Sequence, residues 1–225
     1  MPNFYVVATP IGNLEDMTLR AIRVLKEVDL ILCEDTRTTG RLLKHYEIKT
    51  KMASYNSHST IGKADFILRA LEEGKNVALV SDAGTPTISD PGSLIVSQIY
   101  EHFGDKVKVL SVPGASAVIS ALSISGFPSS DFLFLGFLPH KKGRETLFRE
   151  ISESCRTVVF YESPHRFIKA VESLIKFAPE KQIVICREMT KIFEEVVHGT
   201  PPEIMSYYTK NKDKIKGEFV IVVSS

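Results

Sequence analysis

An acidic pair, Glu34 and Asp35, directly follows a short apolar run at residues 30–33. In an open α/β sheet, ligands bind beyond the carboxyl ends of the strands, so an active-site base belongs at such a position. A carboxylate there could take the proton from a hydroxyl group that attacks an electrophile. The alternative is structural, because Asp35 or Thr36 could cap the helix that follows. The sequence leaves both roles open for Asp35, with Glu34 assisting it in the catalytic one.

A loop at residues 81–92 follows another apolar run and combines two Gly, two Pro and two Asp. Proline fixes the backbone and glycine permits close approach, so this loop can present its own N–H and C=O groups to a ligand. Its far end has a structural explanation, with Asp90 as N-cap and Pro91 at the first helical position. Shorter loops at residues 9–13 and 112–117 also follow apolar runs. None has the G-x-G-x-x-G pattern of a dinucleotide site.

Basic residues follow several of the predicted strands and suit phosphate groups. Each alone is more often part of a solvated face or a helix cap, but their common placement after strands shifts the balance toward phosphate binding. Ser163 and Pro164 predict the start of a helix, and the N-terminus of a helix favours binding of a phosphate group. The candidates are Arg37, Arg41, Lys141, Lys142, Arg144, His165 and Arg166.

The elements that position these residues alternate along the whole chain. The predicted strands are residues 4–8, 30–33, 77–80, 107–111, 132–135, 157–161, 183–186, 196–198 and 219–223. Amphipathic helices are predicted at 18–28, 38–46, 61–73, 93–102, 115–123, 145–152, 166–177 and 202–208. This alternation predicts an α/β fold with a mostly parallel sheet in an N-terminal lobe, residues 1–114. The close spacing of 183–186 and 196–198 predicts an antiparallel hairpin, and so a mixed sheet, in a C-terminal lobe of residues 115–225. A ligand cleft is expected between the lobes.

Composition narrows the class of protein. Of the 225 residues 44% are hydrophobic, which excludes intrinsic disorder, and 28 Lys and Arg balance 27 Asp and Glu. Any nucleic-acid surface must therefore be a local patch. Cys33, Cys155 and Cys186 are expected to be buried, reduced thiols, and no metal site is expected. The chain shows neither a signal-peptide pattern nor an apolar run of membrane-spanning length, so a cytoplasmic protein without membrane association is expected.

Seven stretches carry a specific resemblance: VVATPIGNLEDMTLRA, CEDTRTTGRLL, VALVSDAGTPTISDPG, VPGASA, GFLPHKKGR, FYESPHR and CREMTKIFEEVVHG. In this order they resemble the ribosomal RNA cytidine-2'-O-methyltransferase family, which shares the two-lobed fold of tetrapyrrole methylases. The resemblance implies S-adenosylmethionine as cofactor in the cleft. It also implies methylation of a cytidine ribose in small-subunit (16S) ribosomal RNA, free or in the assembled 30S subunit, by a homodimer. The implied cofactor-lining positions are Pro10, Asp82, Gly84, Thr85, Ile88, Ser116, Ala117, Tyr161 and Glu162.

One departure from the family pattern falls at residues 55–59. Family members usually have Tyr-His-x-His-Asn there, whereas this chain has Tyr-Asn-Ser-His-Ser and keeps only His58, a further candidate for RNA contact. Two other functions stay open. One is methylation of a precorrin-type tetrapyrrole with the same fold and cofactor. The other is non-catalytic nucleotide or RNA binding.

Overall fold

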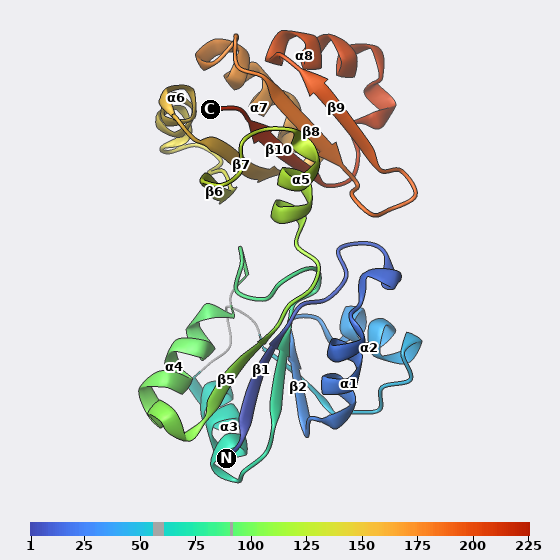
Figure 1. The fold of residues 1–225 in the computed structure, drawn as a ribbon, viewed down its shortest axis with the longest axis vertical. Coiled ribbons are helices and arrows are strands. Elements are labelled where there is room, and N and C mark those ends of the chain that lie inside the picture. Colours follow the sequence, from blue (N-terminus) through green and yellow to red (C-terminus); the bar gives the residue numbers. More distant parts are fainter. Residues whose placement is uncertain (56–60, 91) are drawn as a thin grey trace. The chain divides into compact units, whose positions relative to one another are not determined.

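The computed structural model describes residues 1–55, 61–90 and 92–225. The chain divides into two compact units, Met1–Ser116 and Ala117–Ser225. Each unit is built around a five-stranded sheet with helices packed against it (Figure 1). The expected α/β fold, with a parallel sheet in the first unit and a mixed sheet in the second, is confirmed.

The sheet of the N-terminal unit has the strand order β3-β2-β4-β1-β5, and its four pairings are all parallel. Its strands are β1 (Asn3–Val7), β2 (Leu30–Cys33), β3 (Met52–Ser54), β4 (Val77–Val80) and β5 (Lys108–Val112). Every residue of β2 and β4 is buried, as expected for parallel strands covered on both faces. The sequence did not predict β3. It has three residues at the sheet edge, and two of them are exposed, so no apolar run marks it.

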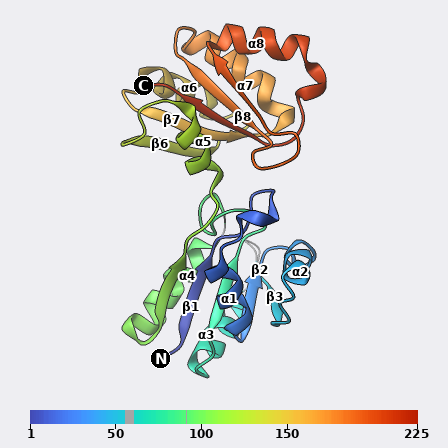
Figure 2. The same ribbon diagram turned by 45° about the vertical axis from the view of Figure 1, so that its right-hand side comes forward.

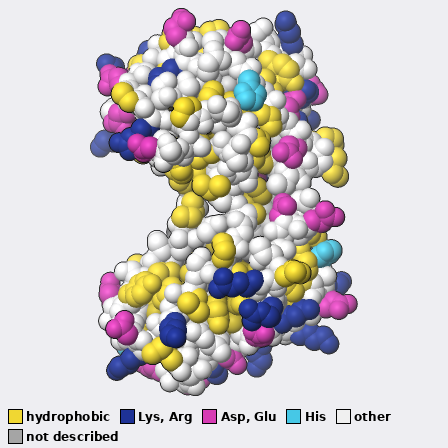
Figure 3. All heavy atoms as spheres, viewed as in Figure 1, with side chains coloured by type: hydrophobic (Ala, Val, Ile, Leu, Met, Phe, Trp, Pro, Cys, Tyr) yellow, Lys and Arg dark blue, Asp and Glu magenta, His cyan; other side chains and the backbone are white. Residues whose placement is uncertain are grey.

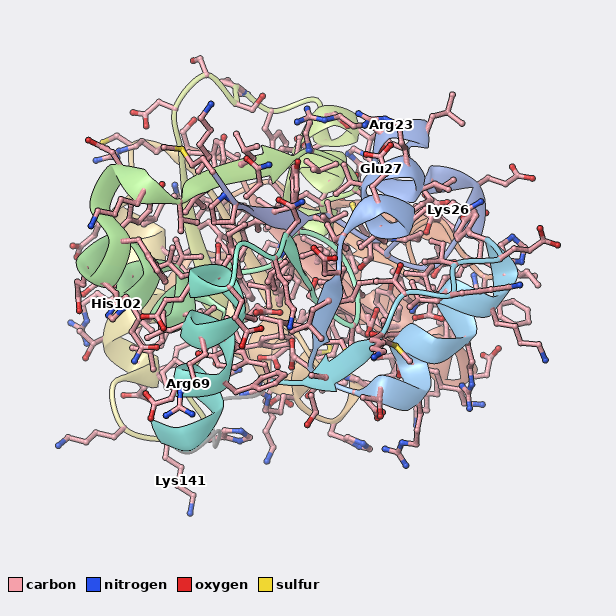
Figure 4. All side chains as sticks on the ribbon, turned by 90° about the horizontal axis from the view of Figure 1, so that it is seen from below. Arg23, Lys26, Glu27, Arg69, His102 and Lys141 are labelled. Carbon is pink, nitrogen blue, oxygen red and sulfur yellow. The ribbon has the colours of Figure 1, made fainter. Side chains whose placement is uncertain are left out.

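Helices cover both faces of this sheet. They are α1 (Leu19–Glu27), α2 (Thr36–His45), α3 (Ile61–Glu72) and α4 (Ser93–Phe103). Leu43 of α2 joins Ile31 in the core on one face, while Ile95 of α4 joins Leu32 in the core on the other. Figure 4 views this unit from below and labels Arg23, Lys26 and Glu27 on α1, and Arg69 on α3. Consecutive residues of β2 therefore point their side chains alternately toward the α1–α2 layer and the α3–α4 layer.

The sheet of the C-terminal unit has the order β6-β7-β10-β8-β9. Its strands are β6 (Phe132–Phe137), β7 (Thr157–Glu162), β8 (Ile183–Arg187), β9 (Glu195–Gly199) and β10 (Phe219–Val223). Strands β6 and β7 run parallel, and the other pairings are antiparallel. The predicted hairpin is confirmed, with Ile185 of β8 opposite Val197 of β9.

The helices of this unit are α5 (Ala117–Ser125), α6 (Arg144–Glu153), α7 (Pro164–Phe177) and α8 (Pro201–Lys210). Helices α7 and α8 contact each other along one side of the sheet (Figure 2). The core centres on stacked rings of Phe167 and Phe219, whose centroids lie 4.2 Å apart. Helix α7 begins as predicted, with Ser163 as N-cap and Pro164 in the first turn.

The three cysteines are free thiols. Cys33 and Cys186 are buried as expected, but the expectation of burial is wrong for Cys155, which is exposed in the turn between α6 and β7. Among the helices that the structure describes, none combines the length and the apolar character needed to cross a membrane.

Candidate functional site

Three loops are tied together at the carboxyl edge of the N-terminal sheet, after β1, β4 and β5. Thr9 forms an isolated antiparallel bridge with Gly84, in which the two N–H groups donate to the opposite carbonyls at 2.9 and 3.1 Å. The Thr9 hydroxyl also donates to the Ser81 carbonyl at 3.1 Å. The Thr85 hydroxyl donates to the Ala115 carbonyl at 3.1 Å. The loop after β4 is therefore fixed to both of its neighbours.

The backbone of these loops is closely packed and locally strained. Gly84 has φ +82°, and a Cβ atom there would lie 3.3 Å from the Ile11 side chain, so both conformation and space require glycine. Thr87 and Ser89 have φ values of 76° and 58°, a left-handed conformation that costs a non-glycine residue about 1 kcal/mol or more. Such strain persists where the surrounding structure enforces it, and it is typical of ligand-binding loops.

Six of the cofactor-lining positions implied by the resemblance lie in these three loops: Pro10, Asp82, Gly84, Thr85, Ile88 and Ser116. Pro10 and Gly84 are buried, whereas Asp82 and Ile88 are exposed. An exposed aliphatic side chain beside exposed backbone and a carboxylate suits a ligand with both apolar and polar parts. Ala117 follows directly as the first residue of α5.

The carboxyl groups of Glu34 and Asp90 are hydrogen-bonded to each other beside these loops. This bond, together with burial and the nearby charges of Asp90 and Asp82, raises the pKa of Glu34 to about 8. The Glu34 carboxyl group therefore keeps its proton at neutral pH. Sequence reasoning missed this contact, because it joins residues from separate loops.

Asp90 itself differs from its predicted role. Helix α4 begins at Ser93 with Gly92 as its N-cap, so the prediction of Asp90 as N-cap is wrong. Asp90 Oδ1 instead accepts a hydrogen bond from the Gly92 N–H at 2.9 Å, in the turn before the helix. That turn places the helix start two residues later than the Asp-Pro pattern indicated. It also leaves Asp90 able to contact Glu34.

Asp35 caps α2, which is the structural role that the sequence left open. Its Oδ1 accepts from the Arg37 N–H at 2.8 Å, and the Arg37 guanidinium contacts Oδ2 at 2.7 Å. These hydrogen bonds with Arg37 lower the pKa of Asp35 to about 2. A carboxylate with so low a pKa is ionised but only weakly basic. The Asp35 N–H donates to Asp82 at 3.2 Å, which links the cap to the loop after β4.

Glu162, at the end of β7, is fully buried between two arginines. Arg166 Nε lies 2.7 Å from Oε1, and Arg144 Nη2 lies 3.2 Å from Oε2. The same guanidinium groups donate to the carbonyls of Leu138 and Pro139 in the loop after β6. The arginine side chains are only 15% and 13% exposed, and each uses two of its nitrogen atoms in contacts within the protein.

The remaining predicted phosphate-binding residues are more accessible. Arg41, Lys141, Lys142 and His165 are exposed, and Figure 4 shows Lys141 pointing outward. Tyr161 is half-buried against Phe134, with ring centroids 5.1 Å apart, and burial raises its pKa. His58 lies outside the described residues. Across residues 1–55, 61–90 and 92–225, no cluster of His, Cys, Asp and Glu could hold a metal ion.

Comparison with known proteins decides the family. The family model of the tetrapyrrole (corrin/porphyrin) methylases matches residues 3–204. The chain belongs to the tetrapyrrole methylase family. Within this family it is 47% identical to Ribosomal RNA small subunit methyltransferase I of Halalkalibacterium halodurans, over 97% of this chain and 74% of that protein. It is 43% identical to the Thermotoga maritima protein of the same name, over 100% and 99% of the two chains.

Solved structures of other methylases have the same fold. The methyltransferase CobJ matches with a TM-score of 0.71 at 18% identity, over 100% of this chain and 95% of that one. Cobalt precorrin-4 methyltransferase CbiF matches with a TM-score of 0.68 at 16% identity, over 99% and 94%. These likenesses establish the fold, and the expected family membership is confirmed by the family model and the relatives.

Sequence reasoning on this tetrapyrrole methylase missed the two hydroxyl side chains that organise the site. Ser81 Oγ donates to the Gly84 carbonyl at 3.0 Å, beside the contact from Thr9. Ser81 directly follows the buried strand β4, and Thr9 lies two residues beyond the end of β1. Both stand where α/β sheets place ligand loops, and that position was the available signal. Their small polar side chains are nevertheless common in ordinary turns, so type alone did not distinguish them.

Proposed function

We propose that this protein transfers the methyl group of S-adenosylmethionine to the 2'-hydroxyl of a cytidine in small-subunit ribosomal RNA. The observation that carries the proposal is the identity of 43–47% to proteins named Ribosomal RNA small subunit methyltransferase I, over nearly the whole chain. The solved tetrapyrrole methylases are much more distant, at 16–20% identity. Methylation of RNA is therefore favoured over methylation of a macrocycle.

The protein uses S-adenosylmethionine as its methyl donor, and the loops of the N-terminal unit fit such a ligand. The bridge between Gly84 and Thr9 holds the turn rigidly, and exposed Ile88 offers an apolar contact. Asp82 can accept hydrogen bonds from hydroxyl or ammonium groups. The bound cofactor supplies an electrophilic methyl group. The task of the rigid loops is to orient it, and orientation alone can contribute several kcal/mol.

A ribose hydroxyl becomes a competent nucleophile when a base takes its proton, which contributes about a hundredfold or more. Of the acidic pair, we assign this role to Glu34 rather than to Asp35. The pKa of Glu34, about 8, lies near the working pH, whereas Asp35 is held near 2 by Arg37. Asp90 is hydrogen-bonded to the Glu34 carboxyl group, and Asp35 caps the start of helix α2. Activity should then rise with pH toward about 8.

The phosphates of the RNA would meet the exposed cations Arg41, Lys141, Lys142 and His165. Arg37 is 85% exposed and retains donors beyond its contact with Asp35. Arg144 and Arg166 together carry one positive charge more than Glu162, so their excess charge can still attract a phosphate. The substrate can be the free RNA or the 30S subunit, and both place the activity in the cytoplasm.

We also propose a homodimer. At the turn between β8 and β9, Ile192 is 96% exposed and Phe193 is 71% exposed. The turn is held by a hydrogen bond from the Glu194 N–H to the Lys191 carbonyl at 3.0 Å, so the two apolar side chains are presented by an ordered segment. A second copy that covers them would remove unfavourable apolar surface from water. Light scattering should show a dimer for the wild type and a monomer for the Ile192→Ser, Phe193→Ser double variant.

Transfer of a labelled methyl group tests the proposed function against its alternatives. The protein should label RNA in 30S subunits taken from a strain without this enzyme, and it should not label a precorrin-type tetrapyrrole. Labelling of the tetrapyrrole alone would identify a macrocycle methylase. Binding of the cofactor without transfer to any acceptor would identify a non-catalytic binding module.

A further inference from the structure

A groove runs between the C-terminal half of α2 and strand β3, on the N-terminal unit. Its volume is about 710 Å³, within the range of sites that hold nucleotide-sized ligands. Leu43, Ile48 and Met52 provide apolar lining, and Lys44 and Lys49 lie beside them. An apolar surface next to ammonium groups matches the two parts of a nucleotide, the base with its ribose and the phosphate.

The positive charge extends beyond the groove itself. Arg37, Arg41 and Lys44 are spaced by four and three residues, which places them on one face of α2. Within the described part of the chain, neither Arg41 nor Lys44 nor Lys49 forms an ion pair. Figure 3 shows Lys and Arg side chains gathered over the side of this unit that carries α1 and α2. Glu47 is the acidic residue that lines the groove.

Gly40 gives a second, independent observation. It lies in the middle of α2 and lines the groove, where glycine costs about 1 kcal/mol relative to alanine. Its φ is not positive, and a Cβ atom would meet only the Met52 methyl group, at an ordinary 3.6 Å. Neither backbone conformation nor packing therefore requires glycine here. Its missing side chain keeps one wall of the groove open, which permits close approach of a ligand.

We propose that this groove binds a segment of the ribosomal RNA other than the methylated nucleotide, with phosphates at Arg41, Lys44 and Lys49. Lys44 follows Asp35 by nine residues, or about 13 Å along α2, so the segment would be a neighbouring part of the same RNA. Phosphate binding explains why these cations have no carboxylate partners in the described structure. The inference rests on the proposed function only in taking ribosomal RNA as the substrate.

Two triple variants test the groove, and each of them removes three positive charges. Arg41→Ala, Lys44→Ala, Lys49→Ala should weaken binding to a small-subunit ribosomal RNA transcript roughly tenfold or more at low salt. The slope of log affinity against log salt should become shallower by about two to three units. The control is Arg69→Ala, Lys106→Ala, Lys108→Ala, which removes three exposed cations on or beyond the α3–α4 layer. It should leave both affinity and slope close to wild type.

Gly40→Leu tests the same groove without changing charge. The substitution improves helix propensity and narrows the groove, so it should lower RNA affinity several-fold while S-adenosylmethionine binding and thermal stability are kept. If the groove triple and Gly40→Leu both bind the transcript as the wild type does, while methyl transfer proceeds, the groove proposal is overturned and the proposed function stands. Loss of binding to 30S subunits with unchanged binding to the naked transcript would also overturn it, because the partner would then be a protein. A wild-type protein that neither binds nor methylates ribosomal RNA would instead refute the proposed function.

Discussion

Arg166 places its Nε 2.7 Å from Oε1 of Glu162, a carboxylate whose side chain has no exposed surface. The other carboxylate oxygen meets Arg144, and the Ser163 N–H also donates to Oε1 at 2.9 Å. A buried charge is tolerated only when its hydrogen bonds are satisfied, and here all come from the protein. The cluster joins the loop after β6 to the start of α7, so it stabilises the edge of the C-terminal sheet.

Replacing Glu162 by Ala would leave the two guanidinium groups close together and poorly solvated. We expect the free energy of unfolding to fall by about 3–5 kcal/mol, measured by urea denaturation. Glu172→Ala, on the exposed face of the adjoining helix α7, is the matched control and should change stability by less than about 0.5 kcal/mol. Equal stabilities of the two variants would show that the cluster contributes nothing to folding.

Gly84→Ala combines backbone strain with a steric contact in the cofactor loop. Gly74 has nearly the same φ, +81° against +82°, but a Cβ atom there would meet nothing within 4 Å. Both substitutions should lower stability by about 1 kcal/mol through the positive φ. Only Gly84→Ala should weaken S-adenosylmethionine binding, by roughly tenfold or more in calorimetry. Equal cofactor affinity in both variants would remove this loop from the binding site.

The raised pKa of Glu34 makes the stability of the fold depend on pH. The pKa of Glu34 is raised from 4.5 to about 8 in the folded protein, so the folded state binds this proton more tightly than the unfolded state. Its stabilising effect is complete below about pH 4.5 and is lost as pH rises through about 8. Because the group is partly exposed, solvent screening reduces the effect to about 1 kcal/mol. Urea denaturation from pH 5 to 9 should show this loss in the wild type but not in Glu34→Gln, and parallel curves would contradict the raised pKa of Glu34.

Kinetic measurements on variants of Glu34 and Asp35 distinguish the catalytic roles of these two residues. Glu34→Gln should lower kcat by about a hundredfold or more, with cofactor and RNA affinities nearly unchanged. Asp35→Asn should stay within a few-fold of wild type, because Asn caps a helix as well as Asp does. Wild-type kcat should rise with pH toward about 8. The opposite ranking of the two variants would assign the base to Asp35.

The sequence predicted the fold well where periodic patterns are strong. Buried runs such as Leu30–Cys33 predicted parallel strands, whereas Met52–Ser54 is short and mostly exposed and left no pattern. The site was predicted by loop position and family resemblance, which brought Asp82, Gly84 and Thr85 together. The sequence does not show which charged residues form ion pairs in the folded protein. Arg144 resembled a phosphate ligand because its partner Glu162 lies 18 residues away and comes close only on folding.

The central claim is methyl transfer from S-adenosylmethionine to a cytidine 2'-hydroxyl of small-subunit ribosomal RNA. Its most direct measurement is alkaline hydrolysis of 30S RNA after incubation with the wild-type enzyme and labelled cofactor, followed by nucleoside analysis. A 2'-O-methyl group blocks cleavage at its own linkage, so the label should appear in an alkali-resistant dinucleotide that yields 2'-O-methylcytidine. Glu34→Gln should give little of this product under the same conditions. Ordinary cleavage at the labelled position, with the methyl group recovered on a base, would contradict the account.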